Sequence, residues 1–310
     1  MIERIVSARL PVDEEFQIQK NSITSDRADA KKKRICIVTG THGDELEGQY
    51  VCYEIQRRLK EQKKYLKGSV EIYPALNPLG VDTITRGVPK FDLDMNRIFP
   101  GNKEGTMVEH TAAHIIKDLS GADMVIDIHA SNIFLKEIPQ VRINELCQDT
   151  LVPYAKHLNI DYIWIHSAAT VLESTLAHSL NMTGTPCLVV EMGVGMRITK
   201  EYGDQLVDGI FALMKELSIW DGPIRACKRP IISTDGKVSY LNATNSGIFI
   251  PCVKHWIDVK KGQKIGEIVN PLDGELLEEV ISPVTGLLFT LREYPVVYEG
   301  ALVGRILERD

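Results

Sequence analysis

The sequence lacks the features that mark membrane, exported and nucleic-acid-binding proteins. No apolar run approaches the roughly 18 residues that a membrane-spanning helix needs. The opening stretch, MIERIVSARLPVDEEF, places acidic residues beside its apolar ones, unlike a signal peptide. Lys and Arg number 36 against 42 Asp and Glu, so there is no basic excess for nucleic acid. We therefore expect neither a membrane nor a nucleic acid as a partner.

Cysteine is scarce, and no two cysteines form a CxxC pair. This spacing predicts buried thiols in a reducing compartment and not a disulfide framework. Because there is also no export signal, the expected location is the cytoplasm. The six cysteines are Cys36, Cys52, Cys147, Cys187, Cys227 and Cys252.

The composition that is present, 44% hydrophobic and 25% charged over 310 residues, is that of a globular protein with one large and one small domain. Up to about residue 224, short apolar runs typical of buried strands alternate with segments of helical periodicity. This order predicts an α/β domain over residues 1–224, with helices on both faces of its sheet. The expected strands are 35–38, 69–75, 123–128, 162–165 and 187–190, and the expected helices are 45–64, 108–119, 151–158, 173–181 and 204–217.

The pattern changes after about Ile224, where helical periodicity disappears. Segments become short and glycines recur, for example at Gly236, Gly247 and Gly262. Short strands separated by glycine turns predict a small all-β domain over residues 225–310.

The first candidate motif is TGTHGDELEG, residues 39–48, which directly follows an apolar strand and opens a helix. In a turn that enters a helix, His42 and Glu45 are spaced to face one point. Imidazole and carboxylate are zinc ligands, although a simple capping turn also explains the pair when taken alone. The position favours a site, because ligands of open α/β sheets bind beyond the carboxyl ends of the strands.

Two further strands end in polar residues. His129 follows DMVIDI and could supply a third ligand, with Asp127 as a hydrogen-bond acceptor that orients it; a structural histidine is the alternative. Glu191 follows the apolar run CLVV, where a buried carboxylate is costly unless it is paired or functional. Together, His42, Glu45 and His129 form the set of two histidines and one glutamate that is typical of catalytic zinc, with Glu191 placed to act as a base.

The loop RGVPKFDLDMNRIFPG, residues 86–101, adds two arginines and two aspartates. Arg86 could stabilise negative charge as it develops on a carbonyl oxygen, and the adjacent Asn96 and Arg97 could bind a substrate carboxylate. The alternative is a loop held together by internal ion pairs to Asp92 and Asp94.

In their order along the chain, these motifs resemble those of the succinylglutamate desuccinylase/aspartoacylase family, within the zinc carboxypeptidase-like group. THGDELEG is similar to the first metal motif, DIHAS to the second and VEMG to the catalytic glutamate motif. The resemblance covers about residues 35–194 and implies a mixed sheet. It also implies one Zn²⁺ per chain, held by His42, Glu45 and His129, with Glu191 as the catalytic residue.

DLDMNRIFPG resembles the loop of the family that binds carboxylate. This implies that Asn96 and Arg97 are carboxylate binders and that Arg86 is the arginine that polarises the carbonyl. The C-terminal part resembles the barrel-sandwich tail of bacterial members and the related biotinyl and lipoyl domains. Its hairpin, NPLDGE, has no lysine at the position of modification, so we do not expect a carrier function.

One departure concerns the substrate. The stretch ESTLAHSLNMTGTP, residues 173–186, contains no arginine, whereas the aspartoacylase pattern has one there for the side-chain carboxylate of the substrate. We therefore expect hydrolysis of a small N-acyl amino acid or related compound without a required acidic side chain. The alternatives are a carboxypeptidase acting on peptides and a non-catalytic protein that binds metal or ligand. A homo-oligomer is compatible with the sequence.

Overall fold

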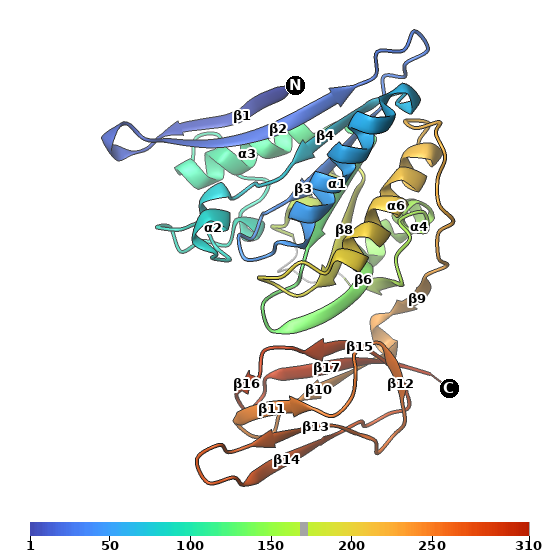
Figure 1. Ribbon diagram of the computed structural model, residues 1–310. Coiled ribbons are helices and arrows are strands. Elements are labelled where there is room, and N and C mark those ends of the chain that lie inside the picture. The colour runs from blue at the N-terminus through green and yellow to red at the C-terminus, as the bar shows by residue number, and fades with distance from the viewer. Residues whose placement is uncertain (168–172, 310) are drawn as a thin grey trace.

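The computed structural model describes residues 1–167 and 173–309 and has the expected mixed α/β architecture, followed by a C-terminal β region (Figure 1). Its larger sheet joins both parts of the chain. In the α/β part, its strands lie in the order β1 (Ile2–Arg9), β2 (Glu15–Thr24), β4 (Ser69–Tyr73), β3 (Arg34–Thr39), β5 (Met124–His129), β8 (Cys187–Gly193) and β6 (Leu135–Asn144). Strand β7 (Tyr162–His166) lies beside β6, and β9 (Ile231–Thr234) lies beside β7.

The centre of this sheet is parallel. Strands β4, β3, β5 and β8 run in one direction, so their carboxyl ends lie at one edge. These strands are buried on both faces, which explains why they appear in the sequence as continuous apolar runs. The five strands expected from the sequence are all present, with ends that differ by a few residues.

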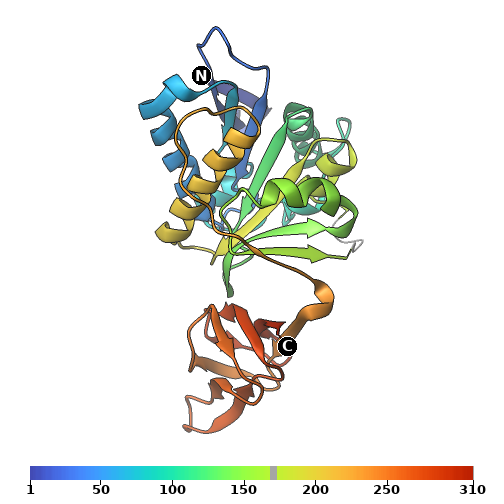
Figure 2. The same ribbon diagram turned by 90° about the vertical axis from the view of Figure 1, so that its right-hand side faces the viewer.

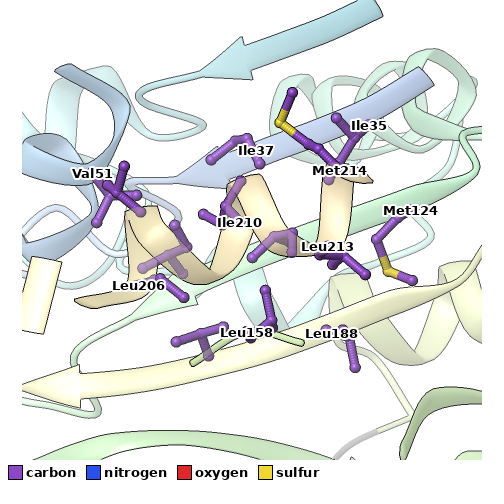
Figure 3. Packing of buried hydrophobic residues seen from close by; sticks show 14 of the residues in the cluster. Ile35, Ile37, Val51, Met124, Leu158, Leu188, Leu206, Ile210, Leu213 and Met214 are labelled. Atoms are coloured by element: carbon purple, nitrogen blue, oxygen red, sulfur yellow. The ribbon is translucent and has the colours of Figure 1, made fainter. Parts of the chain in front are cut away.

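Helices cover both faces of the sheet, as predicted. On one face, α1 (Glu47–Gln62) and α6 (Lys200–Glu216) pack against the central strands, and Figure 3 shows Ile210 and Leu213 of α6 lying against Ile35, Ile37 and Leu188. On the other face lie α3 (Met107–Leu119) and α5 (Leu176–Met182). Two shorter helices, α2 (Pro78–Thr83) and α4 (Gln148–Ala155), occupy connections.

Some helix ends differ from the expectation because side chains cap them. The Thr175 side chain accepts from the His178 N–H, so α5 begins at Leu176 and not near 173. The Asn144 side chain accepts from the Leu146 N–H and starts a turn that leads into α4 at Gln148.

The sequence did not predict the hairpin β1–β2 or strand β6. The hairpin is antiparallel and extends the sheet by pairing β2 with β4. Strand β6 is antiparallel to β8, and it buries Glu137 and Gln140 completely. Because polar residues interrupt its apolar ones, β6 lacks the period of a half-buried strand.

The C-terminal strands form a compact β unit with a core of its own. Figures 1 and 2 show it at one end of the α/β part, reached by a long connection after α6. Its strands are β10 (Val238–Asn242), β11 (Gly247–Pro251), β12 (Ile257–Val259), β13 (Lys264–Val269), β14 (Leu276–Ile281), β15 (Gly286–Arg292), β16 (Val296–Val297) and β17 (Leu302–Glu308).

This unit is joined to the α/β part by strand pairing and by an aromatic cluster. Strand β15 pairs antiparallel with the start of β6, with Thr290 opposite Glu137. Beside this pairing, Phe289 packs against Tyr162 and Trp164 at ring-centroid distances of 5.0 and 5.7 Å. Strand β9, although it follows Ile224, belongs to the α/β sheet through its pairing with β7.

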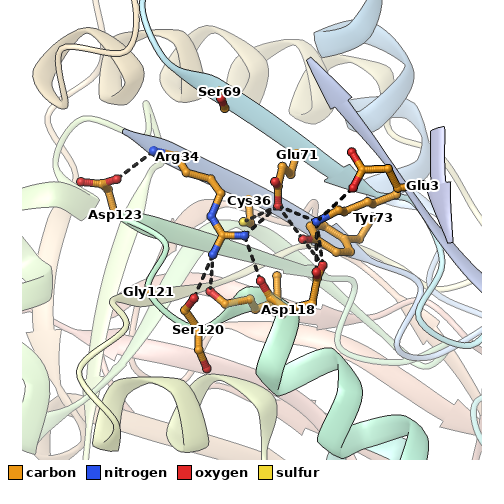
Figure 4. Close-up of polar contacts among 12 residues, drawn as sticks. Glu3, Arg34, Cys36, Ser69, Glu71, Tyr73, Asp118, Ser120, Gly121 and Asp123 are labelled. Atoms are coloured by element: carbon orange, nitrogen blue, oxygen red, sulfur yellow. Dashed lines mark hydrogen bonds and ion pairs between the residues drawn. The ribbon is translucent and has the colours of Figure 1, made fainter. Parts of the chain in front are cut away.

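A buried polar cluster fixes the outer strands to α3 (Figure 4). The Glu71 carboxylate accepts from Arg34 Nη1 at 2.9 Å and from the Tyr73 hydroxyl at 2.7 Å, and Lys20 Nζ lies 3.3 Å away. Lys20 also donates to Asp118 at the end of α3, at 2.9 Å. Although burial opposes it, these partners hold the pKa of Glu71 below its usual range.

Within residues 1–167 and 173–309, no helix combines the length and the apolar character that crossing a membrane requires.

Candidate metal centre and active site

The candidate residues come from the carboxyl ends of three adjacent parallel strands. His42 and Glu45 lie in the turn after β3, His129 is the last residue of β5, and Glu191 lies on β8 directly opposite His129 in the strand register. The turn after β3 needs glycine. A Cβ at Gly43 would lie 1.9 Å from the backbone of Gly80, so only glycine permits this approach.

The turn brings His42, Glu45 and His129 into one buried cluster. Glu45 Oε1 lies 2.9 Å from His42 Nδ1, and Glu45 Oε2 lies 2.9 Å from His129 Nδ1. One ligand atom from each residue lies within 4.8 Å of the others. The structure thus unites the three residues that the sequence indicated as metal ligands.

The donor set fits a divalent cation. Two imidazoles and one carboxylate, 2–4% exposed, are the ligands of catalytic zinc sites. The buried Nε2 atom of His129 lies 3.1 Å from Asp127 Oδ2, its closest charged neighbour on that side in the described part of the chain. Although burial opposes it, Asp127 and Glu45 raise the pKa of His129 well above its ordinary value. The surroundings of His129 therefore favour a positive charge, which a proton or a metal ion can supply.

Glu191 is 8% exposed and borders the same cavity. Its Oε1 lies 3.4 Å from Arg142 Nη1, and its Oε2 has no hydrogen-bond partner within residues 1–167 and 173–309. Burial raises the pKa of Glu191, and this is opposed by the charges of Arg142 and His129.

Arg86 and Asp94 lie at the partly exposed side of the cluster. Arg86 Nη1 donates to Glu45 Oε1 at 2.9 Å, and its Nη2 lies 3.4 Å from Asp94 Oδ2. Asp94 Oδ1 lies 3.0 Å from His42 Nε2. One of the internal ion pairs expected under the alternative interpretation of the loop 86–101 is therefore present, between Arg86 and Asp94.

Asn96 and Arg97 both reach the cavity, but they differ in how they are held. The Asn96 Oδ1 atom accepts from the Leu176 N–H at 2.9 Å, which ties the loop to the start of α5. The Arg97 side chain is exposed, and its Nη1 donates to the Asn96 carbonyl at 2.8 Å. A buried amide and an exposed guanidinium thus lie next to each other at the cavity.

The cavity has a volume of about 250 Å³. Its metal end is formed by the residues described above. Beyond them, a largely apolar wall is formed by Ile143, Cys147, Leu151, Ala177, Met182 and Val189. Asn144 and Asn181 also line it, but their side chains bond to nearby backbone groups.

Three further residues line this cavity but were not predicted from the sequence. They are Arg142, His166 and His178. Arg142 could have been found as a charged residue between apolar ones in PQVRIN, by the reasoning used for Glu191. The two histidines have no spacing relative to the metal motifs that would have indicated them.

A mixed α/β sheet that gathers two histidines and two glutamates at the ends of adjacent strands defines a protein with a candidate catalytic metal centre. A family model described as the succinylglutamate desuccinylase/aspartoacylase catalytic domain matches residues 31–217. The chain belongs to this family, as its motifs predicted.

Individual relatives agree with this assignment. A curated protein from Halomonas elongata, N-alpha-acetyl-L-2,4-diaminobutyric acid deacetylase, is 24% identical over 273 residues, covering 86% of this chain and 75% of its own. The structure of a succinylglutamate desuccinylase/aspartoacylase from Rhodobacter sphaeroides superposes with a TM-score of 0.83 at 21% identity, covering 100% of this chain and 95% of that one. The product-bound ectoine utilization protein EutE from Ruegeria pomeroyi gives a TM-score of 0.82 at 20% identity, over 98% and 93% of the two chains. These likenesses extend over the C-terminal β unit and show a shared fold.

Proposed function

We propose that this protein is a zinc-dependent deacylase that hydrolyses the amide bond of a small N-acyl amino acid or related compound. The observation that carries the proposal is the buried His42–Glu45–His129 cluster with Glu191 opposite His129, all facing one cavity. The names of the relatives, a deacetylase of an acetylated diamino acid and desuccinylases, support the same reaction class.

The proposed chemistry divides the work between the metal and the chain. When bound, zinc would act as a Lewis acid, which lowers the pKa of water and polarises a carbonyl. Glu191 takes the proton from the attacking water and returns it to the leaving amine. A base in this role needs an oxygen that is not already bonded, and Glu191 Oε2 meets that requirement among the described residues.

Two arginines have separate proposed roles. Arg86, at the partly exposed side of the cluster, stabilises the negative charge that develops on the carbonyl oxygen. Asn96 and Arg97 bind the α-carboxylate of the amino-acid half. Asn96 Nδ2, for which the described residues offer no acceptor, and the Arg97 fork can donate to the same anion.

The cavity wall favours an uncharged group on the substrate. Every Arg, Asp and Glu in the described lining is assigned above to metal or substrate, or is paired with such a residue, as Arg142 is with Glu191. Helix α5 contributes Ala177 and Met182 but no arginine. An acidic side chain on the substrate therefore meets no unassigned arginine or lysine, the remaining basic groups of the described lining being His166 and His178, and we expect it to give no large advantage.

The test is a panel of N-acyl amino acids that varies the acyl group and the side chain, with release of the free amine as the readout. Wild-type protein should cleave some members, and Glu191→Gln should cleave none at a comparable rate. A short peptide with a free terminal carboxylate belongs in the panel. Cleavage of that peptide, with no cleavage of any N-acyl amino acid, would contradict the proposal and indicate a carboxypeptidase.

A further inference from the structure

The Glu137 carboxylate is 0% exposed and lies where β6 pairs with β15. Its Oε1 accepts from Arg142 Nη2 at 3.0 Å and from Arg305 Nη1 at 2.8 Å. Its Oε2 accepts from Thr290 Oγ1 at 2.6 Å and from Gln140 Nε2 at 2.8 Å. Two of these four donors belong to the α/β part, and two belong to the C-terminal β unit.

Arg142 connects this buried carboxylate to the active site. While its Nη2 bonds to Glu137, its Nη1 lies 3.4 Å from Glu191 Oε1. The ring of Trp164 lies beside both guanidinium groups, with its centroid 5.4 Å from Arg142 and 5.5 Å from Arg305. A continuous charged path therefore runs from the C-terminal unit to the proposed base.

The path is sensitive to the loss of any member. Although burial opposes it, Arg142 and Arg305 hold the pKa of Glu137 below its usual range, so Glu137 is an anion. Removing one partner of such a buried set leaves an uncompensated charge, and the remaining groups must then rearrange. Without Arg305 or Thr290, Glu137 has fewer contacts to hold it in place, and Arg142 is no longer fixed.

We propose that Arg142 is a positioning residue for the Glu191 carboxylate, and that Arg305 and Thr290 of the C-terminal unit hold it in place through Glu137. This inference rests on the proposed function, in which Glu191 is the base. Contact with Arg142 fixes Oε1 of Glu191 and leaves Oε2 to face the reacting water. The C-terminal unit then contributes to turnover without contacting the substrate.

The test uses the full chain and a substrate that the wild type cleaves. Arg142→Met should lower kcat by at least about tenfold, because Glu191 loses its buried ion-pair partner and is no longer held in place. KM should stay within about twofold, since Glu191 and not the substrate is displaced. Arg305→Met should also lower kcat, but by a smaller factor. Arg142→Lys and Arg305→Lys should each recover part of the loss, because the positive charge is restored.

Arg292→Met is the matched control. Arg292 lies on β15 opposite Leu135 of β6, in the same contact between the two parts, but among the described residues its side chain donates only to the backbone carbonyls of Tyr294, Leu302 and Val296. Its loss should lower the melting temperature without changing kcat per folded, metal-loaded molecule. A double variant is the second readout: Arg305→Met should have little further effect on kcat once Arg142 is Met, because both act through one path.

The outcomes distinguish a failure of the positioning role of Arg142 from a failure of the proposed function. If Glu191→Gln is inactive while Arg142→Met retains the wild-type kcat, the positioning role is wrong and the proposed function stands. A rise in KM with unchanged kcat in Arg142→Met would make Arg142 a substrate-binding residue and overturn the inference. Equal losses in Arg305→Met and Arg292→Met would show that Arg305 is only structural. A wild-type protein that cleaves no member of the panel would overturn both proposals.

Discussion

His129 and Glu191 lie opposite each other on adjacent parallel strands, β5 and β8. Each follows a buried apolar run, so the same edge of the sheet presents an imidazole and a carboxylate next to each other. Glu45 reaches His129 from the turn after the next strand, β3, and Arg142 reaches Glu191 from β6 on the other side. One sheet edge therefore holds the metal donors and the proposed base in a fixed order, which makes their roles separable by mutation.

The metal prediction concerns His129. Purified wild-type protein should contain about one zinc ion per chain, as a site with three protein ligands requires. His129→Ala should contain almost none, because His129 supplies one of the three donors of the cluster found among the described residues. Metal content measured by mass spectrometry checks this. His110→Ala, on the exposed end of α3, is the control and should retain zinc. Full occupancy in His129→Ala would show that His129 is not a ligand.

The base prediction concerns Glu191. Glu191→Gln preserves shape but cannot take a proton, so kcat should fall by at least about 10² while zinc stays bound. Parallel measurements of kcat and metal content distinguish a base from a ligand. Glu61→Gln, at an exposed position on α1, should behave as wild type. Turnover that does not change in Glu191→Gln would remove this residue from the mechanism.

The substrate prediction concerns Arg97. Loss of one charged hydrogen-bond partner costs roughly 1.5–3 kcal/mol, or about 10- to 150-fold in kcat/KM. Arg97→Ala should show a loss of this size on an N-acyl amino acid with a free α-carboxylate. The loss should be much smaller on the corresponding amide, which presents no anion. If both substrates lose equally, Arg97 only maintains its loop through the bond to the Asn96 carbonyl.

The stability prediction concerns Glu71 in the cluster of Figure 4. Its pKa in the folded state lies below the ordinary value of 4.5, so its stabilisation is present above that pH and is lost as the pH falls further. The melting temperature of Glu71→Gln should therefore lie below that of the wild type at pH 7, and the gap should narrow below about pH 4.5. Glu3→Gln, whose carboxylate is partly exposed and 3.9 Å from Lys20, should give a much smaller gap. A gap that does not depend on pH would refute the assignment.

Much of the fold and most of the candidate site could be predicted from the sequence because the signals were local. Buried parallel strands appear as continuous apolar runs; His129 and Glu191 each follow such a run directly, and His42 follows one after a short turn. The carboxyl ends of parallel strands lie at the same end of a sheet, so polar residues that follow such strands could be expected in one region without coordinates. The change after Ile224 to short, glycine-rich segments likewise indicated a separate β region.

The tertiary structure alone decided the contacts between distant segments. Nothing near Glu137 in the sequence indicates that Arg305, 168 positions away, would share its carboxylate with Arg142. Strand β6 has polar and charged residues among its apolar ones because its partners in β15 and β17 supply the compensating donors. The bond from Asn96 to the start of α5 and the apolar wall of the cavity are of the same kind. Local sequence specifies where a strand ends, but burial and charge compensation depend on which strands become neighbours.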